Sequence, residues 1–169
     1  MKKVKAFIAA GAVAGLSVLP LAASAANPTT ANITASVGAS ISITATNVNI
    51  SSIVPGNAGT GSTSVNVRTN TTKGFTVSVK GGNLASANNT IAPNTSAAAG
   101  TEGWSIMNDG NNPIAPSSTD QLLWTYAAAA GNTQAINESK SFDVTVGTES
   151  TTPNGTYTGT ITLTAAATE

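Results

Sequence analysis

Apolar and polar residues alternate with a period of two along several short stretches of the chain. The clearest stretch lies near the C-terminus, where Tyr157, Gly159, Ile161, Leu163 and Ala165 alternate with threonines. In a strand, successive side chains point to opposite faces, so this stretch predicts a strand with one apolar face and one hydroxyl-rich face.

The same alternation recurs upstream, between segments rich in glycine, proline and asparagine that predict turns. The alternating sets are Ile33, Ala35 and Val37; Ile41 and Ile43; Val65 and Val67; Phe75, Val77 and Val79; and Phe142, Val144 and Val146. Short strands with turns at this spacing predict an all-β fold, an immunoglobulin-like or Greek-key β-sandwich of roughly eight strands. The stretch around Phe142 and the C-terminal stretch from Tyr157 are separated by the turn Pro153-Asn154-Gly155. These two stretches therefore predict a hairpin or a sandwich corner.

The middle of the chain, residues 83–137, is less regular and leaves two alternatives open. Thr119 or Asp120 could cap a short helix that runs from Gln121 to Ala130 and ends at Gly131. The same window also fits a strand through Leu122, Trp124 and Tyr126.

The N-terminus has the three parts of a secretory signal peptide. Three lysines precede an apolar run over residues 6–21, and Ala23-Ser24-Ala25 supplies a small-x-small cleavage site. We therefore expect residues 1–25 to be a signal peptide and residues 26–169 a single sandwich domain. The expected location is extracellular or on the surface of a bacterial cell. No membrane span is expected after cleavage, because the apolar run is short and interrupted.

Composition narrows the chemistry that the chain can perform. The sequence has no cysteine and no histidine, which excludes Ser-His-Asp and Cys-His nucleophile systems and the common zinc sites. Without the signal peptide, four basic residues stand against seven acidic ones, so nucleic acid is not an expected partner. We expect no cofactor and no enzymatic activity. A carboxylate-based hydrolase is the weaker alternative, since no motif pairs the available acids, Glu102, Asp109, Asp120, Glu138, Asp143 and Glu149.

Two segments resemble known bacterial surface domains. The run from Pro153 to Thr164 resembles the closing strand of spore-coat-U and fimbrial-type domains and of the WxL cell-wall-binding domains. The run from Thr72 to Lys80 resembles the first Trp-x-Leu strand of the WxL family. Phe75 and Val77 stand at the first Trp-x-Leu motif, and Leu163 and Ala165 at the second, so both motifs are degenerate. The resemblance implies an exported β-sandwich, and intact motifs would imply attachment to peptidoglycan.

Three groups of residues are candidates for contact with a ligand or partner. Asp109 and Asn111 lie in an oxygen-rich loop, a weak candidate for a hard cation such as Ca²⁺. Trp104, Trp124 and Tyr126 could stack against sugars or anchor a protein. Ile33, Ala35 and Val37 form an alternating segment that could add to the sheet of a neighbouring molecule as a strand.

We therefore expect a structural or adhesive surface module that binds itself or other surface proteins through strand edges. The alternative is a module that binds a glycan or cell-wall polysaccharide.

Overall fold

A computed structural model describes residues 34–87 and 89–168, and Val37–Glu169 forms one compact unit. The described residues form strands, turns and loops and contain no helix, which confirms the predicted all-β class. The predicted signal peptide, residues 1–25, lies outside the described residues, as does Ile33. The strands are β1 (Ile41–Ala45), β2 (Ala58–Thr69), β3 (Gly74–Gly81), β4 (Leu84–Ala85), β5 (Thr90–Ile91), β6 (Gly103–Met107), β7 (Pro113–Ile114), β8 (Gln121–Ala127), β9 (Ile136–Gly147) and β10 (Ile161–Ala167).

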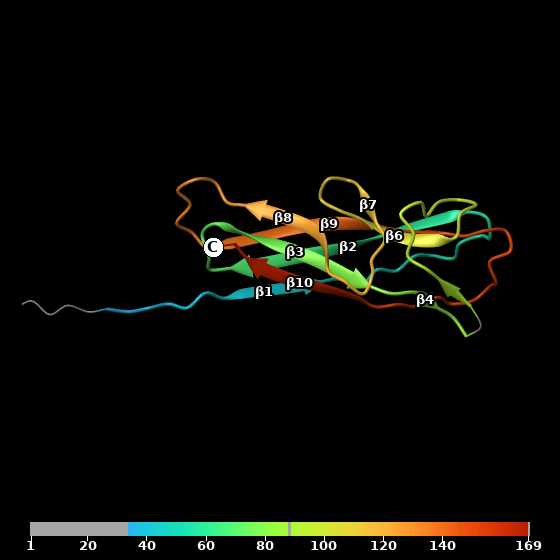
Figure 1. Cartoon of the computed structure of the whole chain (residues 1–169), viewed down its shortest axis with the longest axis horizontal. Coiled ribbons are helices and arrows are strands. Elements are labelled where there is room, and N and C mark those ends of the chain that lie inside the picture. The colour runs from blue at the N-terminus through green and yellow to red at the C-terminus, as the bar shows by residue number, and fades with distance from the viewer. Residues whose placement is uncertain (1–33, 88, 169) are drawn as a thin grey trace, which may run out of the picture. The chain divides into compact units, whose positions relative to one another are not determined.

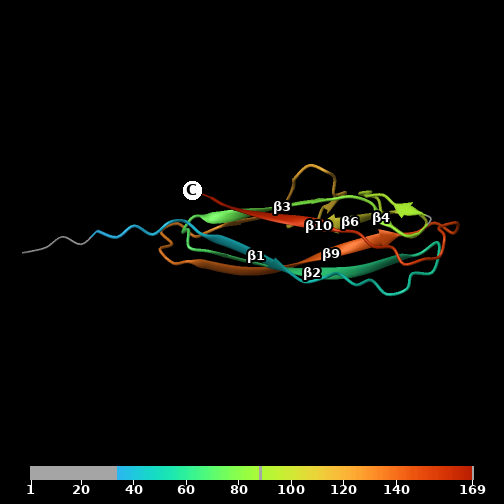
Figure 2. The ribbon, with the colours of Figure 1, turned by 90° about the horizontal axis from the view of Figure 1, so that it is seen from below.

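The strands build a sandwich of two antiparallel sheets, seen as two layers in Figure 2. One sheet has the order β1-β2-β9-β6-β7 and the other the order β10-β3-β8, while β4 and β5 form a separate short hairpin (Figure 1). The chain crosses from one large sheet to the other between β2 and β3, between β7 and β8, between β8 and β9, and between β9 and β10, and it returns from β3 to β6 through the β4–β5 hairpin. The stretches around Phe142 and Leu163 therefore form a sandwich corner, because β9 and β10 lie in different sheets.

The alternating sequence pattern decides which face of each strand is buried. The longest ladder joins β2 and β9, with Ala58 opposite Gly147 at one end and Thr69 opposite Ile136 at the other. Val65, Val67, Phe142, Val144 and Val146 on these strands are buried. The intervening side chains are mostly serine, threonine and asparagine. The buried valines supply the hydrophobic driving force, while the short polar side chains keep the outer face hydrated.

An irregularity in β8 explains why the middle segment was ambiguous. The window that could have been a helix is a strand, Gln121–Ala127, paired with β3. The register shifts between Val77 and Ser78, which leaves Leu123 as an extra residue, a β-bulge. Leu123 and Trp124 are consequently both buried, whereas Leu122 is 59% exposed. The bulge thus breaks the period of two that would have identified the strand.

Aromatic rings link the two sheets at the centre of the core. Phe75 in β3 meets Trp124 edge-on, with ring centroids 4.8 Å apart, and stacks on Tyr126 at 5.3 Å. Trp124 reaches across to Phe142 in the opposite sheet, at 6.0 Å. Edge-to-face and offset-stacked pairs are the geometries that aromatic rings prefer, so this cluster adds directional contacts to the burial of apolar area.

Two predicted strands differ from the observed ones. Residues 34–40 form no strand, so the alternation of Ala35 and Val37 is not accompanied by pairing in this structure. The C-terminal strand begins at Ile161 rather than near Tyr157, because residues 153–160 form a loop that touches β4 through a single bridge, Ala85 to Thr158. Alternation alone therefore does not produce a strand, because a strand also needs a partner.

Candidate functional site

A large hollow in the described residues lies between the edges of the two sheets. β1 pairs with β2 and β10 pairs with β3, so among the described strands each has a ladder partner on one side. The loops that follow β1 and precede β10 bound a groove of about 1080 Å³, which we call the edge groove. Its lining is mixed: threonine, serine and asparagine side chains alternate with apolar ones, which include Ile43, Val48, Ile50, Ile53, Leu84, Tyr157, Ile161 and Leu163, above the buried Ile91, Trp104, Val144 and Val146. Its volume is slightly larger than the range of about 300–1,000 Å³ that is usual for small-ligand pockets.

The first wall of the groove is the segment after β1, which packs against two glycines of β2. A Cβ placed on Gly59 would lie 2.7 Å from Ile50 and 2.8 Å from Ile53, and one on Gly61 would lie 3.0 Å from Val48. Because these positions lack side chains, the segment after β1 can lie directly against β2. The partly buried Val48, Ile50 and Ile53 then pack on the core. The two glycines therefore determine how closely this wall approaches the sheet.

The backbone of this wall is largely unpaired. The ladder ends where the Thr46 amide donates to the Ser64 carbonyl and the Thr63 hydroxyl donates to the Thr46 carbonyl. Within the described part of the chain, the backbone from Asn47 to Ile53 forms no hydrogen bond to another residue. Asn47, Asn49, Ser51 and Ser52 in this stretch are exposed, so its backbone N–H and C=O groups are accessible to water or to an added strand.

The second wall is fastened through Tyr157. Its hydroxyl donates to the Pro153 carbonyl at 2.8 Å and accepts from the Asn89 side chain at 3.1 Å. One residue later, Thr158 and Ala85 exchange backbone hydrogen bonds of 2.8 and 2.9 Å. These contacts fix the loop against β4 and β5 before β10 begins. The wall is thus formed by an ordered loop and not by a strand.

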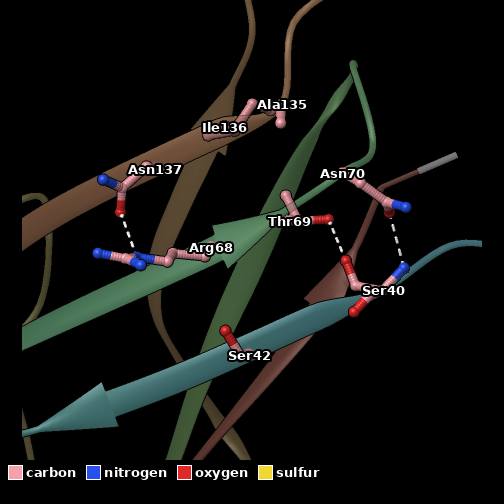
Figure 3. A pocket seen from close by; sticks show the side chains of 8 residues that line it. All are labelled: Ser40, Ser42, Arg68, Thr69, Asn70, Ala135, Ile136 and Asn137. Carbon is pink, nitrogen blue, oxygen red and sulfur yellow. Dashed lines mark hydrogen bonds between the residues drawn. The ribbon is translucent and has the colours of Figure 1, made fainter.

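A second, smaller hollow lies where β1, β2 and β9 meet (Figure 3). It has a volume of about 410 Å³ and contains the Arg68 guanidinium, whose Nε donates to the Asn137 side chain at 3.2 Å. The Asn70 side chain accepts from the Ser40 amide at 2.7 Å and donates to the Gly38 carbonyl at 2.8 Å. This hollow is open, and the hydrogen bonds of Asn70 at its side hold the entry to β1.

The aromatic residues singled out in the sequence do not form one exposed surface. Trp104 is 2% exposed, and its indole Nε1 donates to the Gly82 carbonyl at 3.0 Å. Trp124 is 5% exposed and lies within the aromatic cluster. Tyr126 is half-buried, and its pKa is raised, first by a hydrogen bond to the Glu138 side chain, then by burial and by the charge of Glu138. Neither tryptophan therefore offers a ring face to solvent.

The residues of the proposed cation loop contact other protein groups. Asp109 forms an ion pair with Lys140 of β9, and the Asn108 side chain accepts from the amides of Gly110 and Asn112, both at 2.9 Å. Asn111 is exposed and has a positive φ of 55°. Across residues 34–87 and 89–168, no group of three or more acidic side chains gathers where it could hold a metal ion. The loop is accordingly an asparagine-stabilised turn with a salt bridge at its side.

The candidate catalytic acids lie in separate environments. Glu102 accepts from the Thr152 hydroxyl at 2.6 Å, Asp109 pairs with Lys140, and Glu138 contacts Tyr126. Asp120, Asp143 and Glu149 are exposed on a loop, on the outer face of β9 and on another loop. Each buried or half-buried acid is thus engaged by a different neighbour.

Sequence reasoning missed the residues that shape the edge groove. Val48 and Ile50 alternate, and Gly59 and Gly61 follow with the same spacing in β2, so the signal was present in two segments. This signal does not show that the two segments pack together, which only the fold reveals. No protein-family model and no curated protein sequence matches the chain. In the part of the chain that the structure describes, no helix is long and apolar enough to cross a membrane.

Proposed function

We propose that this chain is an exported, non-catalytic module of the cell surface, which serves a structural or adhesive role and joins partners through the edges of its sandwich. The observation that supports this most is the edge groove, bounded by β1 and β10, each of which pairs on one side among the described strands. Exposed strand edges are sites at which other chains add, and most proteins protect them.

The outer faces of the sheets are consistent with a role in water outside the cell. Ser64 and Ser139 oppose each other across β2 and β9 with hydroxyl oxygens 3.4 Å apart, and the Asn66 side chain donates to that of Asn137 at 3.2 Å. On the other sheet, Thr162 and Thr164 of β10 are exposed. Hydroxyl and amide groups of this kind hydrate a surface that has few charges.

The contacts of the acidic side chains support a non-catalytic role, because each of the half-buried acids binds a different neighbour. Catalysis by two carboxylates needs the pair to flank one substrate bond, at about 5–9.5 Å. Here Glu102, Asp109 and Glu138 are engaged by Thr152, Lys140 and Tyr126, on different elements. The alternative of glycan binding would need a surface other than the two indole rings, since both are buried.

Fractionation of cells that express the full chain tests this function. We expect the protein in the extracellular or surface fraction, with intact-mass analysis showing loss of the first 25 or 26 residues. The chain with Lys2, Lys3 and Lys5 replaced by glutamate is the matched control and should be retained, because a signal peptide needs its positive n-region. Full-length protein in the cytoplasm would overturn the proposal.

A further inference from the structure

We propose that the edge groove is the docking site for residues 27–37 of a second copy of this chain, which enter it as an extended strand. The inference rests on the proposed surface function and identifies the partner through which such a module would assemble. Three properties of the groove define its occupant: an unpaired stretch of backbone, a lining in which apolar and uncharged polar side chains alternate, and the absence of charged side chains.

The unpaired backbone favours an extended peptide over a small molecule. The backbone of the wall from Asn47 to Ile53 forms no hydrogen bond to another described residue, and β1 and β10 each pair on one side among the described strands. A strand laid along the Asn47–Ile53 wall can bond to its backbone groups, whereas a sugar or lipid would satisfy few of them. The groove therefore presents the requirements of strand addition.

The segment before Gly38 has the side chains that such a groove accepts. Residues 27–37, eleven in number, would span about 36 Å when extended. Ile33, Ala35 and Val37 would face one side, and the polar residues between them the other. Val37 is 87% exposed and residues 34–37 belong to no strand, so the described end of this segment has apolar surface left to bury.

Charge also matches between the segment and the groove. Residues 27–37 contain no ionisable side chain, and none of the residues that line the groove is charged. Burying charged groups without partners is costly, so a strand without charged side chains avoids that desolvation penalty as long as the α-amino group at its start stays in water. Any of the charged surface segments of the chain would fit less well.

The anchoring of Gly38 and Ser40 indicates that the docked segment comes from a second copy of the chain. Asn70 binds the carbonyl of Gly38 and the amide of Ser40, which holds these residues at the start of β1. The groove begins further along, at Ile43, and continues past the end of β1. To enter the groove of its own chain, the preceding segment would have to reverse direction at the residues that Asn70 holds. A segment from another copy needs no such reversal.

The test measures the mass of the chain beginning at Asn27, which retains the whole compact unit, by light scattering over a range of concentrations. We expect polymers whose mass increases with protein concentration. The Val37→Lys variant should need at least a tenfold higher concentration to polymerise, because it would bring a charge into an uncharged groove. Leu122→Lys is the matched control, because Leu122 is also an exposed apolar residue but lies on β8 outside the groove. Circular dichroism should show both variants folded.

A labelled peptide with the sequence of residues 27–37 provides the second measurement. It should bind the Val37→Lys protein and shorten polymers of the unmodified chain, whereas the peptide with lysine at both Ile33 and Val37 should do neither. Polymers that persist unchanged in Val37→Lys would overturn the proposal. A stable monomer at all concentrations would also overturn it, and so would failure of the peptide to bind.

These outcomes separate the inference from the proposed function. A chain that polymerises in this way but stays in the cytoplasm would defeat the surface function and leave the groove assignment standing. A chain that is exported but monomeric and indifferent to the peptide would defeat the groove assignment alone.

Discussion

The indole of Trp124 stands at 89° to the ring of Phe75, with the ring centroids 4.8 Å apart. Trp124 also contacts Phe142 in the opposite sheet, so its removal would open a cavity at the centre of the sandwich. Trp124→Ala is expected to lower the free energy of unfolding by about 3–5 kcal/mol. Urea denaturation measures this change. Leu122→Ala, at an exposed neighbouring position, should change stability by only about 0.5 kcal/mol, and equal losses in the two variants would contradict a structural role for Trp124.

Gly147 ends β9 where two backbone carbonyls come close. A side chain at this position would meet the carbonyls of Ala98 and Thr101 and the Ala98 amide, none of which can rotate away. Gly147→Ala should therefore destabilise the fold by about 1–3 kcal/mol through overpacking. In Gly82→Ala, the added Cβ meets nothing within 4 Å, so stability should change little or rise slightly. Thermal unfolding of the two variants compares a crowded glycine with an open one.

Tyr126 makes stability depend on pH in the alkaline range. Its pKa in the folded state is raised above 10.0, chiefly by the hydrogen bond to Glu138, so the folded state favours the neutral phenol. This contribution is complete below the unfolded pKa, near 10, and is lost as pH rises through the folded pKa. Tyr126→Phe should therefore lose less stability than the unmodified chain when pH is raised through this window. Parallel pH dependence of the two urea midpoints would contradict the assignment.

Asn70 holds the start of β1 through two hydrogen bonds. Asn70→Ala removes both the bond to the Ser40 amide and the bond to the Gly38 carbonyl. We expect a modest loss of about 1 kcal/mol, since these groups are exposed and water can replace the lost partners. Faster hydrogen exchange at the Ser40 amide would report local release. Asn154→Ala, at an exposed loop position, should leave that exchange rate unchanged.

The all-β class and most of the core were predictable because burial follows a period of two. Val65, Val67, Phe75, Val77, Val79, Phe142, Val144 and Val146 were identified by alternation alone, and all are buried. The pattern works for these residues because each belongs to a strand with one face on the core. The bulge around Leu123 disturbs this period, so the sequence predicts either a helix or a strand for the segment from Gln121.

The edge groove was not predictable from alternation, because it depends on contacts between distant segments. Val48 and Ile50 precede β2 in the sequence, yet their position depends on the missing side chains of Gly59 and Gly61. The opposite wall comes from residues more than one hundred positions later, around Tyr157. A local pattern indicates that a residue is apolar, but it does not indicate which non-local neighbour will cover it. Trp104 and Trp124 illustrate the same limit, since the sequence left open whether their rings were buried or exposed.

The first and last strands leave the folded unit at the same end. Ile41 of β1 pairs with Thr69, and Ala167 of β10 pairs with Phe75, a few residues beyond the turn that joins β2 to β3 (Figure 1). A tension applied between the two ends of the folded unit would consequently separate each terminal strand from its neighbour one hydrogen-bonded pair at a time. The force would not act on all hydrogen bonds of a ladder at once. The module would yield at low force when pulled by its ends, while the long β2–β9 ladder would remain intact until both terminal strands had been stripped away.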